Sequence, residues 1–209
     1  MDEQRTDEWY AARLGKVTAS RVADVMAKTK SGYSTSRANY MAQLVAERLT
    51  GTKTDGFVNA AMQWGIDHED QAVTAYEFFR DETAETVGFV DHPDIAMSGA
   101  SPDRLIGTAG LVEIKCPITA THIATLRSGK GDSKYVKQMQ WQMDCTERDW
   151  CDFVSFDPRM PAAMQMFVTR IERDQKLIED IRAEVTGFLS ELDALVGELQ
   201  SKYGQQEAA

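Results

Sequence analysis

The sequence is poor in the residues that build disulfide-rich and zinc-dependent proteins. It has three cysteines among 209 residues, with no pair at CxxC spacing, and three histidines with no HxxxH or HExxH motif. An odd number of scattered cysteines argues against a disulfide framework, and structural zinc sites need about four ligands. We therefore expect no zinc hydrolase centre, and reduced, mostly buried thiols at Cys116, Cys145 and Cys151.

Long apolar runs are absent as well. No stretch approaches the ~20 apolar residues that cross a bilayer, and the first residues, MDEQR, lack the apolar core of a secretory signal. The chain has no internal repeat, low-complexity tract or Pro-rich linker, and its length suits one domain with a substantial core. The sequence thus predicts a cytoplasmic protein that forms a single domain over residues 1–209, with no membrane-spanning segment.

Positive charge is in deficit, since 23 basic residues stand against 33 acidic ones and the net charge is −10. A sum of this sign argues against binding nucleic acid, but binding depends on where the charges lie. Residues 5–37 carry seven basic and three acidic side chains, residues 127–137 carry four and one, and residues 171–209 carry four and nine. We interpret this polarity as one basic face and an acidic C-terminal region. Scattered solvated charge is the alternative for either basic stretch.

The apolar pattern predicts helices towards both ends of the chain and short strands between them. A second helix is expected to be capped by Thr18 to Ser20, and the polar segment 28–36 indicates a loop. The other expected helices are 7–14, 40–49, 62–79, 135–144 and 178–199, and the expected strands are 86–90, 95–97, 104–106, 111–115, 150–156 and 166–171. The fold class is therefore α/β, with a small central mixed sheet flanked by helices.

Two of these helices carry clear apolar stripes. In the helix 62–79 the candidate core residues are Trp64, Val73, Tyr76 and Phe79. In the C-terminal helix, apolar residues recur at intervals of three and four over 178–199, and we expect this stripe to pack on the core. A contact between subunits is the alternative for the same stripe.

One stretch, SPDRLIGTAGLVEIKCP at residues 101–117, carries the residues best suited to chemistry. Asp103 follows a proline at the expected start of a strand, and Glu113 lies ten positions later, across the predicted hairpin. Side chains at i and i+2 of a strand share a face, so Glu113 and Lys115 point the same way. Ile114 then points into the core and leaves its backbone carbonyl as an oxygen ligand. The hairpin places Asp103 beside Glu113.

Two carboxylates and a carbonyl make a hard-oxygen site of the kind that Mg²⁺ prefers, with water completing its coordination. A lysine beside a metal-bound water can stabilise a developing hydroxide or the extra charge on a phosphate. Together these groups suit the hydrolysis of a phosphodiester. An exposed hairpin with a surface Glu–Lys pair is the alternative, but Glu113 and Lys115 lie in an apolar run, LVEIK, where charge is costly unless it has a partner.

The pattern Pro102-Asp103…Glu113-Ile114-Lys115 resembles the PD-(D/E)xK nuclease superfamily. Further motifs resemble its phage lambda exonuclease branch, the YqaJ-like viral recombinases. They are, in chain order, Trp9…Arg13-Leu14-Gly15…Thr18-Ala19-Ser20, Trp64-Gly65…Glu69, Ser101-Pro102-Asp103, Glu113-Ile114-Lys115-Cys116-Pro117, Gln138-x-Gln140 and Phe156-Asp157-Pro158-Arg159. The likeness spans roughly residues 7 to 200 and implies a restriction-endonuclease-like core.

The resemblance implies catalytic roles for the matching residues. Asp103, Glu113 and the Ile114 carbonyl would bind the metal, implied to be two Mg²⁺ ions with Mn²⁺ as a substitute. Lys115 would position or activate the attacking water.

Two residues on helices extend this implied set. Glu69 would be the third acidic residue and a further metal ligand, and Gln138 would contact the site or the scissile strand. Taken without the resemblance, each indicates only a polar or charged residue on a helix surface.

The resemblance also implies a binding region for DNA ends. Arg13, Ser20 and Ser101 match a pocket for a terminal 5′-phosphate, where a guanidinium can form paired hydrogen bonds with phosphate oxygens. Lys30 stands where the family often has a DNA-contacting arginine, so it keeps the charge but not the paired donors. Met62 matches an apolar residue that wedges the first base pairs apart, and a core position is its alternative.

These roles imply a magnesium-dependent 5′-to-3′ exonuclease acting on linear double-stranded DNA. It would release mononucleotides and leave a 3′ single-stranded tail for recombination, with a single-strand annealing protein as partner. The resemblance further implies a toroidal homotrimer, whose acidic C-terminal region we expect to face outward.

Two other functions stay open. A DNA-end-binding protein without catalysis is the first, and the intact Asp103, Glu113 and Lys115 argue against it. A superfamily endonuclease of restriction or resolvase type is the second, and the match at Arg13 argues against it.

Overall fold

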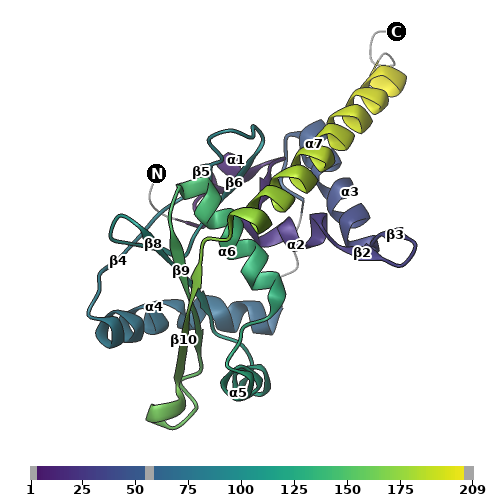
Figure 1. Cartoon of the computed structure of the whole chain (residues 1–209). Coiled ribbons are helices and arrows are strands. Elements are labelled where there is room, and N and C mark those ends of the chain that lie inside the picture. The colour runs from purple at the N-terminus through teal and green to yellow at the C-terminus, as the bar shows by residue number, and fades with distance from the viewer. Residues whose placement is uncertain (1–3, 55–58, 205–209) are drawn as a thin grey trace.

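The computed structural model describes residues 4–54 and 59–204. The single-domain prediction for residues 1–209 and the end of the acidic C-terminal region, 205–209, therefore extend beyond the described residues. The described part is mixed α/β, as expected, with small sheets flanked by helices (Figure 1). Among the residues described, none of the helices has the length and apolar character needed to cross a membrane.

The main sheet has five strands in the order β10-β9-β8-β7-β4. Their bounds are β4 Ala84–Glu85, β7 Arg104–Ile106, β8 Gly110–Lys115, β9 Trp150–Phe156 and β10 Met166–Glu172. Strands β8 and β9 are parallel and the other neighbours are antiparallel. A parallel pair needs a long crossover, which here contains two helices, α5 (Thr119–Ser128) and α6 (Ser133–Thr146).

Alternate residues of β8 face opposite sides of this sheet. Val112 and Ile114 pack with Tyr76 of α4 (Ala60–Arg80), on one face. Leu111 packs with Met143 of α6, on the other face. This period of two follows from the pleat of a strand, and it places Glu113, between Val112 and Ile114, on the α6 side.

A second sheet has three strands in the order β1-β6-β5, and its strands β5 and β6 contact helix α6. Its strands are β1 Val17–Thr18, β5 Val90–Asp91 and β6 Ser98–Ala100, and a small hairpin joins β2 Lys28–Thr29 to β3 Gly32–Tyr33. The helices are α1 Asp7–Arg13, α2 Val22–Val25, α3 Thr35–Thr50 and α7 Gln175–Tyr203, with 3-10 turns η1 Ala19–Arg21 and η2 Ala162–Met164. Helix α1 is capped by the Thr6 side chain, as its sequence predicts.

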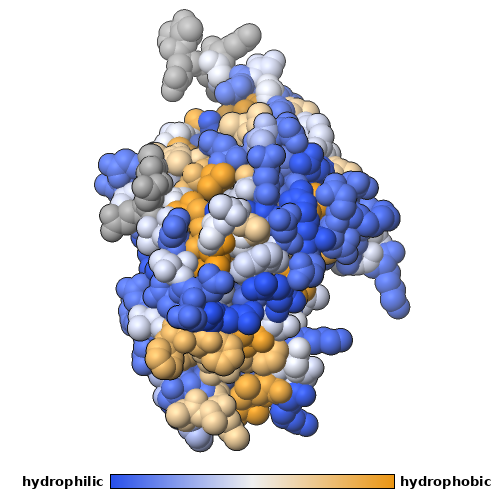
Figure 2. Space-filling view, turned by 60° about the vertical axis from the view of Figure 1, so that its left-hand side comes forward, coloured by the Kyte–Doolittle hydropathy of each residue, from blue (hydrophilic) through white to orange (hydrophobic). Residues whose placement is uncertain are grey.

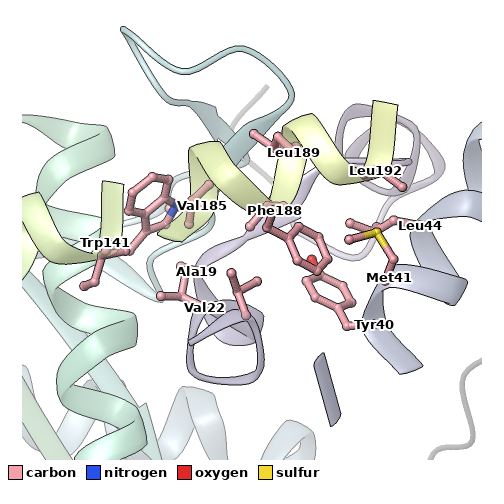
Figure 3. Close-up of a cluster of buried hydrophobic side chains, with 14 of the residues drawn as sticks. Ala19, Val22, Tyr40, Met41, Leu44, Trp141, Val185, Phe188, Leu189 and Leu192 are labelled. Carbon is pink, nitrogen blue, oxygen red and sulfur yellow. The ribbon is translucent and has the colours of Figure 1, made fainter. Parts of the chain in front are cut away.

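The largest apolar cluster joins α7 to α3, η1, α2 and α6. Phe188 of α7 stacks on Tyr40 of α3 with 5.7 Å between ring centroids (Figure 3). Val185 and Leu192 extend the contact, and Trp141 of α6 is buried in the same cluster. The apolar stripe of the C-terminal helix therefore packs on the core, as predicted, and the alternative of a subunit contact is not needed to explain it.

Several predicted elements are wrong or misplaced. Residues 95–97 form a turn, and strand β6 follows at 98–100, because Met97 adopts a left-handed φ of 59° that ends any extended run. Of the strand predicted at 86–90, only Val90 is in a strand. The predicted loop 28–36 contains the β2–β3 hairpin, and helix α5 was not predicted at all.

Two local predictions on helices also fail. The expected second helix is a 3-10 turn followed by the four residues of α2, and neither has a side-chain cap, so Ser20 is not an N-cap. Phe79 is 62% exposed instead of buried. Tyr76 and Arg80, one turn apart, both bind the buried Asp152, and this orientation leaves Phe79 outward.

Three acidic residues of α7 pair with basic residues from the N-terminal part of the chain, and the outward orientation of the acidic region in a trimer stays a prediction. Glu184 pairs with Lys28, and Glu191 pairs with Arg37 at 2.8 Å. Asp193 pairs in the same way with Arg48. The predicted basic face is therefore smaller than the sequence suggests, since Lys28 and Arg37 are neutralised by the C-terminal helix.

Candidate active site

The β7–β8 hairpin brings Asp103 and Glu113 together as the sequence predicts. Arg104 pairs with Val112, so the preceding Asp103 comes opposite Glu113. The Asp103 carboxylate accepts a hydrogen bond from the Ile114 amide, with Oδ2 and N 2.6 Å apart. Amide and carbonyl of one strand residue point to the same neighbour, so the Ile114 carbonyl is directed to the Asp103 side as well.

Glu113 is fully buried and held by three donors. The Lys115 ammonium pairs with Oε1. Gln138 also donates to Oε1, and Gln142 donates to Oε2, each with 2.6 Å between nitrogen and oxygen. Gln138 and Gln142 lie one turn apart on α6, so the same helix face carries both amides. The Glu113 carboxylate is thus fixed in orientation, and helix α6 supplies two of its three donors.

Gln142 was missed by sequence reasoning, although a signal existed. It lies four residues after the predicted site residue Gln138, where a helix repeats its face. It is buried, and its Oε1 has no hydrogen-bond partner among the described residues.

Burial and neighbouring charge set the protonation of these groups. Burial, followed by the charge of Glu113, raises the pKa of Asp103 to about 8. Burial alone would lower the pKa of Lys115, but the carboxylates of Glu113 and Asp103 outweigh it and raise that pKa above its usual range. Lys115 is therefore a fixed positive charge at neutral pH, which stabilises anions and does not accept protons.

Glu69 lies near these residues, and its carboxylate forms ion pairs with two arginines. Arg5 pairs with Oε2, and Arg104 donates to Oε1 at 3.3 Å. Among the described residues, no three His, Cys, Asp or Glu side chains come together in a way that could hold one metal ion. The structure thus places Asp103 opposite Glu113, and the roles of Asp103, Glu113 and Glu69 as metal ligands stay predictions.

The cleft itself is lined from several elements. It includes the predicted site residues Ser20, Met62, Glu69, Asp103, Ile114, Lys115 and Gln138. Met62 is 52% exposed, so its alternative as a core residue is wrong. Lys30 lies at the tip of the β2–β3 hairpin, exposed and outside this cleft.

A second cavity adjoins the cleft and contains Arg13. The Arg13 guanidinium lies 4.1 Å from the centroid of the Trp9 ring and donates to Ser101 Oγ at 2.9 Å. Trp9 Nε1 donates to the same oxygen at 3.0 Å. Ser20 lines both the cavity and the cleft. The structure therefore brings Arg13 and Ser101 together and places Ser20 on the lining of the same cavity as Arg13, while Ser101 itself is not part of that lining. Their role as an anion pocket stays a prediction.

Within residues 4–54 and 59–204, the cysteines are buried and two of the histidines are held by hydrogen bonds of the fold. The thiols of Cys116, Cys145 and Cys151 are buried, as predicted, and burial raises the pKa of Cys116 to about 12. His92 is bound to Asp144, and His122 to Ser155 and to the Met164 carbonyl.

Residues 8–149 match the YqaJ-like viral recombinase domain, which is more than half of the chain. The chain belongs to the YqaJ-like viral recombinase family. The matched range includes every predicted site residue from Arg13 to Gln138, whereas the motif at Phe156–Arg159 lies outside it.

Solved structures extend the likeness of this YqaJ-family chain to 96% of its length. An alkaline exonuclease from Laribacter hongkongensis is 55% identical, with a TM-score of 0.90, and the match covers 96% of this chain and 100% of that one. The same enzyme has also been solved in complex with dAMP. A phage-related exonuclease from Haemophilus somnus 129PT, at 17% identity and a TM-score of 0.66 over 88% of this chain and 96% of that one, shares the fold.

A shorter relative of this YqaJ-family chain is the Escherichia coli K12 protein named ExoD. It is 31% identical over 74 residues, which make up 35% of this chain and 84% of that protein.

Proposed function

We propose that this YqaJ-family protein is a deoxyribonuclease that degrades one strand of linear double-stranded DNA from its 5′ end. It releases mononucleotides and leaves a 3′ single-stranded tail. One observation carries the proposal: Asp103 and Lys115 line a cleft that adjoins the cavity of Arg13, and the buried Glu113 pairs with Lys115 directly behind it. The 55% identity to an alkaline exonuclease over its whole length supports the same activity.

The donors at this site fit Mg²⁺ in kind. Asp103 and Glu113 supply carboxylate oxygens and Ile114 a main-chain oxygen, and Mg²⁺ prefers such ligands while it keeps several waters. The raised pKa of Asp103 supports the fit, because a divalent cation would relieve the repulsion from Glu113 that contributes to it. We propose Mg²⁺ as the cofactor, as two ions with Glu69 near the second, and Mn²⁺ as a substitute.

When bound, Mg²⁺ would activate water and neutralise charge on the phosphate. The protein's own side chains do the rest. Lys115, charged at neutral pH, stabilises the extra negative charge of the phosphate during attack. Gln138 and Gln142 keep the Glu113 carboxylate in one orientation, so that the site needs little rearrangement when substrate arrives.

End recognition is assigned to the cavity of Arg13. Its guanidinium is stacked on Trp9 and oriented by Ser101, and this arrangement favours paired hydrogen bonds to a terminal 5′-phosphate. An endonuclease would not need such a pocket beside its active centre. The distance between the pocket and the cleft would then set the cut near the end.

Digestion of matched substrates tests the proposal. With Mg²⁺, we expect linear duplex DNA to be degraded and closed circular DNA to stay intact, and 5′-phosphorylated ends to be preferred to 5′-hydroxyl ends. Arg13→Ala should reduce that preference, whereas Lys176→Gln, on exposed surface of α7, should not. Nicking of closed circles would instead favour an endonuclease, and intact linear DNA a binding protein without catalysis.

The biological setting proposed with this activity is DNA recombination in the cytoplasm. The 3′ tail is a substrate for strand annealing, so a single-strand annealing protein is the proposed partner. A homotrimer enclosing the DNA is the proposed working unit.

A further inference from the structure

Arg5 lies between the two cavities that the proposed function uses. It lines the cleft with Asp103 and Lys115, and it also lines the cavity of Arg13. Its guanidinium pairs with Glu69, yet 43% of the Arg5 side chain is exposed, against 17% for Glu69. Part of the positive charge therefore faces space that a ligand spanning both cavities would occupy.

Glu69 does not depend on Arg5 for neutralisation. Arg104 donates to the other oxygen of the same carboxylate, and the Arg104 side chain is only 13% exposed. Arg104 is further fixed by the Asp103 carbonyl, which accepts from it at 2.6 Å. Of the two arginines, Arg104 is thus the buried structural partner, and Arg5 is the one that reaches the cavities.

The backbone at Arg5 is held in a conformation that suits glycine better. Its φ is +69°, in the left-handed region that other residues rarely adopt. Gln4, just before it, donates to the carbonyls of Val87 at 3.0 Å and of Pro102 at 2.7 Å. Thr6, just after it, caps α1. Strain that is held from both sides in this way often marks a functional position.

The surrounding charge favours an anion at this place. The cavity of Arg13 has five basic side chains and one acidic one along its lining, namely Arg5, Arg13, Lys16, Arg21, Lys53 and Glu47. The cleft beyond Arg5 is of mixed charge, with the acidic residues Asp24, Glu69 and Asp103 and the basic residues Lys115 and Lys134 along its lining. Arg5 thus lies at the boundary between a cationic cavity and a centre of mixed charge.

We propose that Arg5 binds a backbone phosphate of DNA at the passage from the Arg13 cavity to the active centre. A guanidinium can donate to two phosphate oxygens, and the pair with Glu69 holds it at the passage before DNA arrives. This proposal rests on the proposed function, because it takes the strand to run from Arg13 to Asp103. Arg5 would then align the strand for cleavage near its end.

Two substitutions at Arg5 test this proposal. Arg5→Gly removes the guanidinium and relieves the left-handed backbone, so its melting temperature should equal or exceed that of the wild type. Binding to linear duplex DNA in Ca²⁺ should weaken roughly tenfold, and the slope of log K against log salt should fall by about 1. Arg5→Lys keeps the charge and should retain the wild-type slope, with an intermediate affinity.

Lys176→Gln is the matched control, since Lys176 forms a comparable pair with an acidic residue, Asp180, on an exposed helix face. It should change neither affinity nor slope. In digestion with Mg²⁺, Arg5→Gly should raise KM more than it lowers kcat. Unchanged binding and slope, with only kcat reduced, would overturn the proposal and make Arg5 a support for Glu69.

The same measurements separate this proposal from the proposed function. Binding in Ca²⁺ requires no hydrolysis, so a wild type that digests linear DNA while Arg5→Gly binds it normally would refute only the role of Arg5. A wild type that binds DNA ends but leaves linear DNA intact in Mg²⁺ would refute the exonuclease, whatever Arg5 does.

Discussion

At Asp103 we expect pH, metal binding and stability to be linked through a single residue. Burial and the charge of Glu113 raise its pKa from 3.8 to about 8. Because the folded pKa lies above the unfolded one, the native state keeps a proton that the unfolded chain loses. The metal-free protein should therefore lose stability as the pH rises from about 4 to about 8. Asp103→Asn should remove most of this dependence and should also abolish cleavage.

Thermal melts in EDTA and in Mg²⁺ at pH 5 and pH 8 measure both effects. At pH 8, Mg²⁺ at about 100 times its Kd should add roughly 2.7 kcal/mol to the free energy of unfolding of the wild type. Asp103→Asn should gain much less. A wild type that melts identically with and without Mg²⁺ at pH 8 would contradict Asp103 as a metal ligand.

Lys115 has a separate task from the carboxylates beside it. Since the pair with Glu113 keeps Lys115 charged at neutral pH, its contribution is electrostatic, and Lys115→Met should slow cleavage at least ~10²-fold. Mg²⁺ binding, measured by calorimetry, should persist because a protonated lysine is not a ligand. Lys115→Arg should recover only part of the rate, since the guanidinium is larger and planar. Loss of metal binding in Lys115→Met would instead indicate a structural role.

Gln142 should matter to the reaction through Glu113. Gln142→Leu removes the only donor found for Glu113 Oε2 among the described residues, so the carboxylate should lose its fixed orientation and cleavage should fall about tenfold or more. Gln140→Leu is the control: Gln140 is buried on the same helix but donates to the Glu172 carbonyl. Its variant should lose stability more than activity. Equal rates for Gln142→Leu and the wild type, with Mg²⁺ affinity unchanged, would refute the positioning role.

At the scale of elements, the sequence predicted the hairpin that carries the site better than the helices around it. Strands β7 and β8 were predictable because apolar runs flank a glycine-containing turn. Helix α5 was not, because its sequence, TATHIATLRS, is rich in threonine, has a weak apolar stripe and has no side-chain cap. Strands β1, β4 and β5 have two residues each, too few for alternation to reveal.

The same limit applies to the site. Asp103, Glu113 and Lys115 lie within thirteen residues of sequence, so hairpin geometry alone brings them together. The partners of Glu69 could not be foreseen, because Arg5 is 64 positions away and Arg104 is 35 positions away. Only the tertiary packing of α4 against the N-terminal segment and β7 determines those contacts.

One buried carboxylate connects helices α6 and α7 with the segments that follow β5 and β10. Asp144 of α6 accepts from His92 at 2.9 Å, from Arg173 at 2.8 Å and from Arg182 of α7 at 2.6 Å. Burial alone would raise its pKa, but the hydrogen bonds from His92 and Arg182 outweigh it and hold the pKa below its usual range. This contribution to stability is therefore present above about pH 4 and is lost as the pH falls further.

Asp144→Asn should consequently lower the free energy of unfolding by about 3–5 kcal/mol at pH 7, since it leaves two arginines without their buried partner. Urea denaturation gives this value directly. Asp193→Asn, which removes an exposed partner of Arg48, should cost less than about 1 kcal/mol. Similar losses in the two variants would show that the Asp144 network does not hold α7 in place.

At the scale of the whole molecule, the net charge and the exposed apolar side chains both bear on whether the protein assembles into a ring. The chain carries a net charge of −10, yet its proposed substrate is a polyanion. Three basic residues pair with acids of α7, and five basic side chains line the cavity of Arg13. A single copy therefore has only local attraction for DNA, whereas a ring would enclose the substrate and keep it bound between cuts.

A trimer is the expected assembly, on the resemblance to the lambda exonuclease branch. The surface is compatible with it: Phe78 is 92% exposed and Phe79 is 62% exposed on α4, and Figure 2 shows apolar side chains gathered towards the lower end of one face. Monomers seldom expose large apolar patches without a partner. Light scattering at micromolar concentration should give a mass near three times 23.4 kDa. Phe78→Glu tests whether α4 contributes to the contact between subunits. A monomeric wild type that still digests long DNA without dissociating would refute the ring.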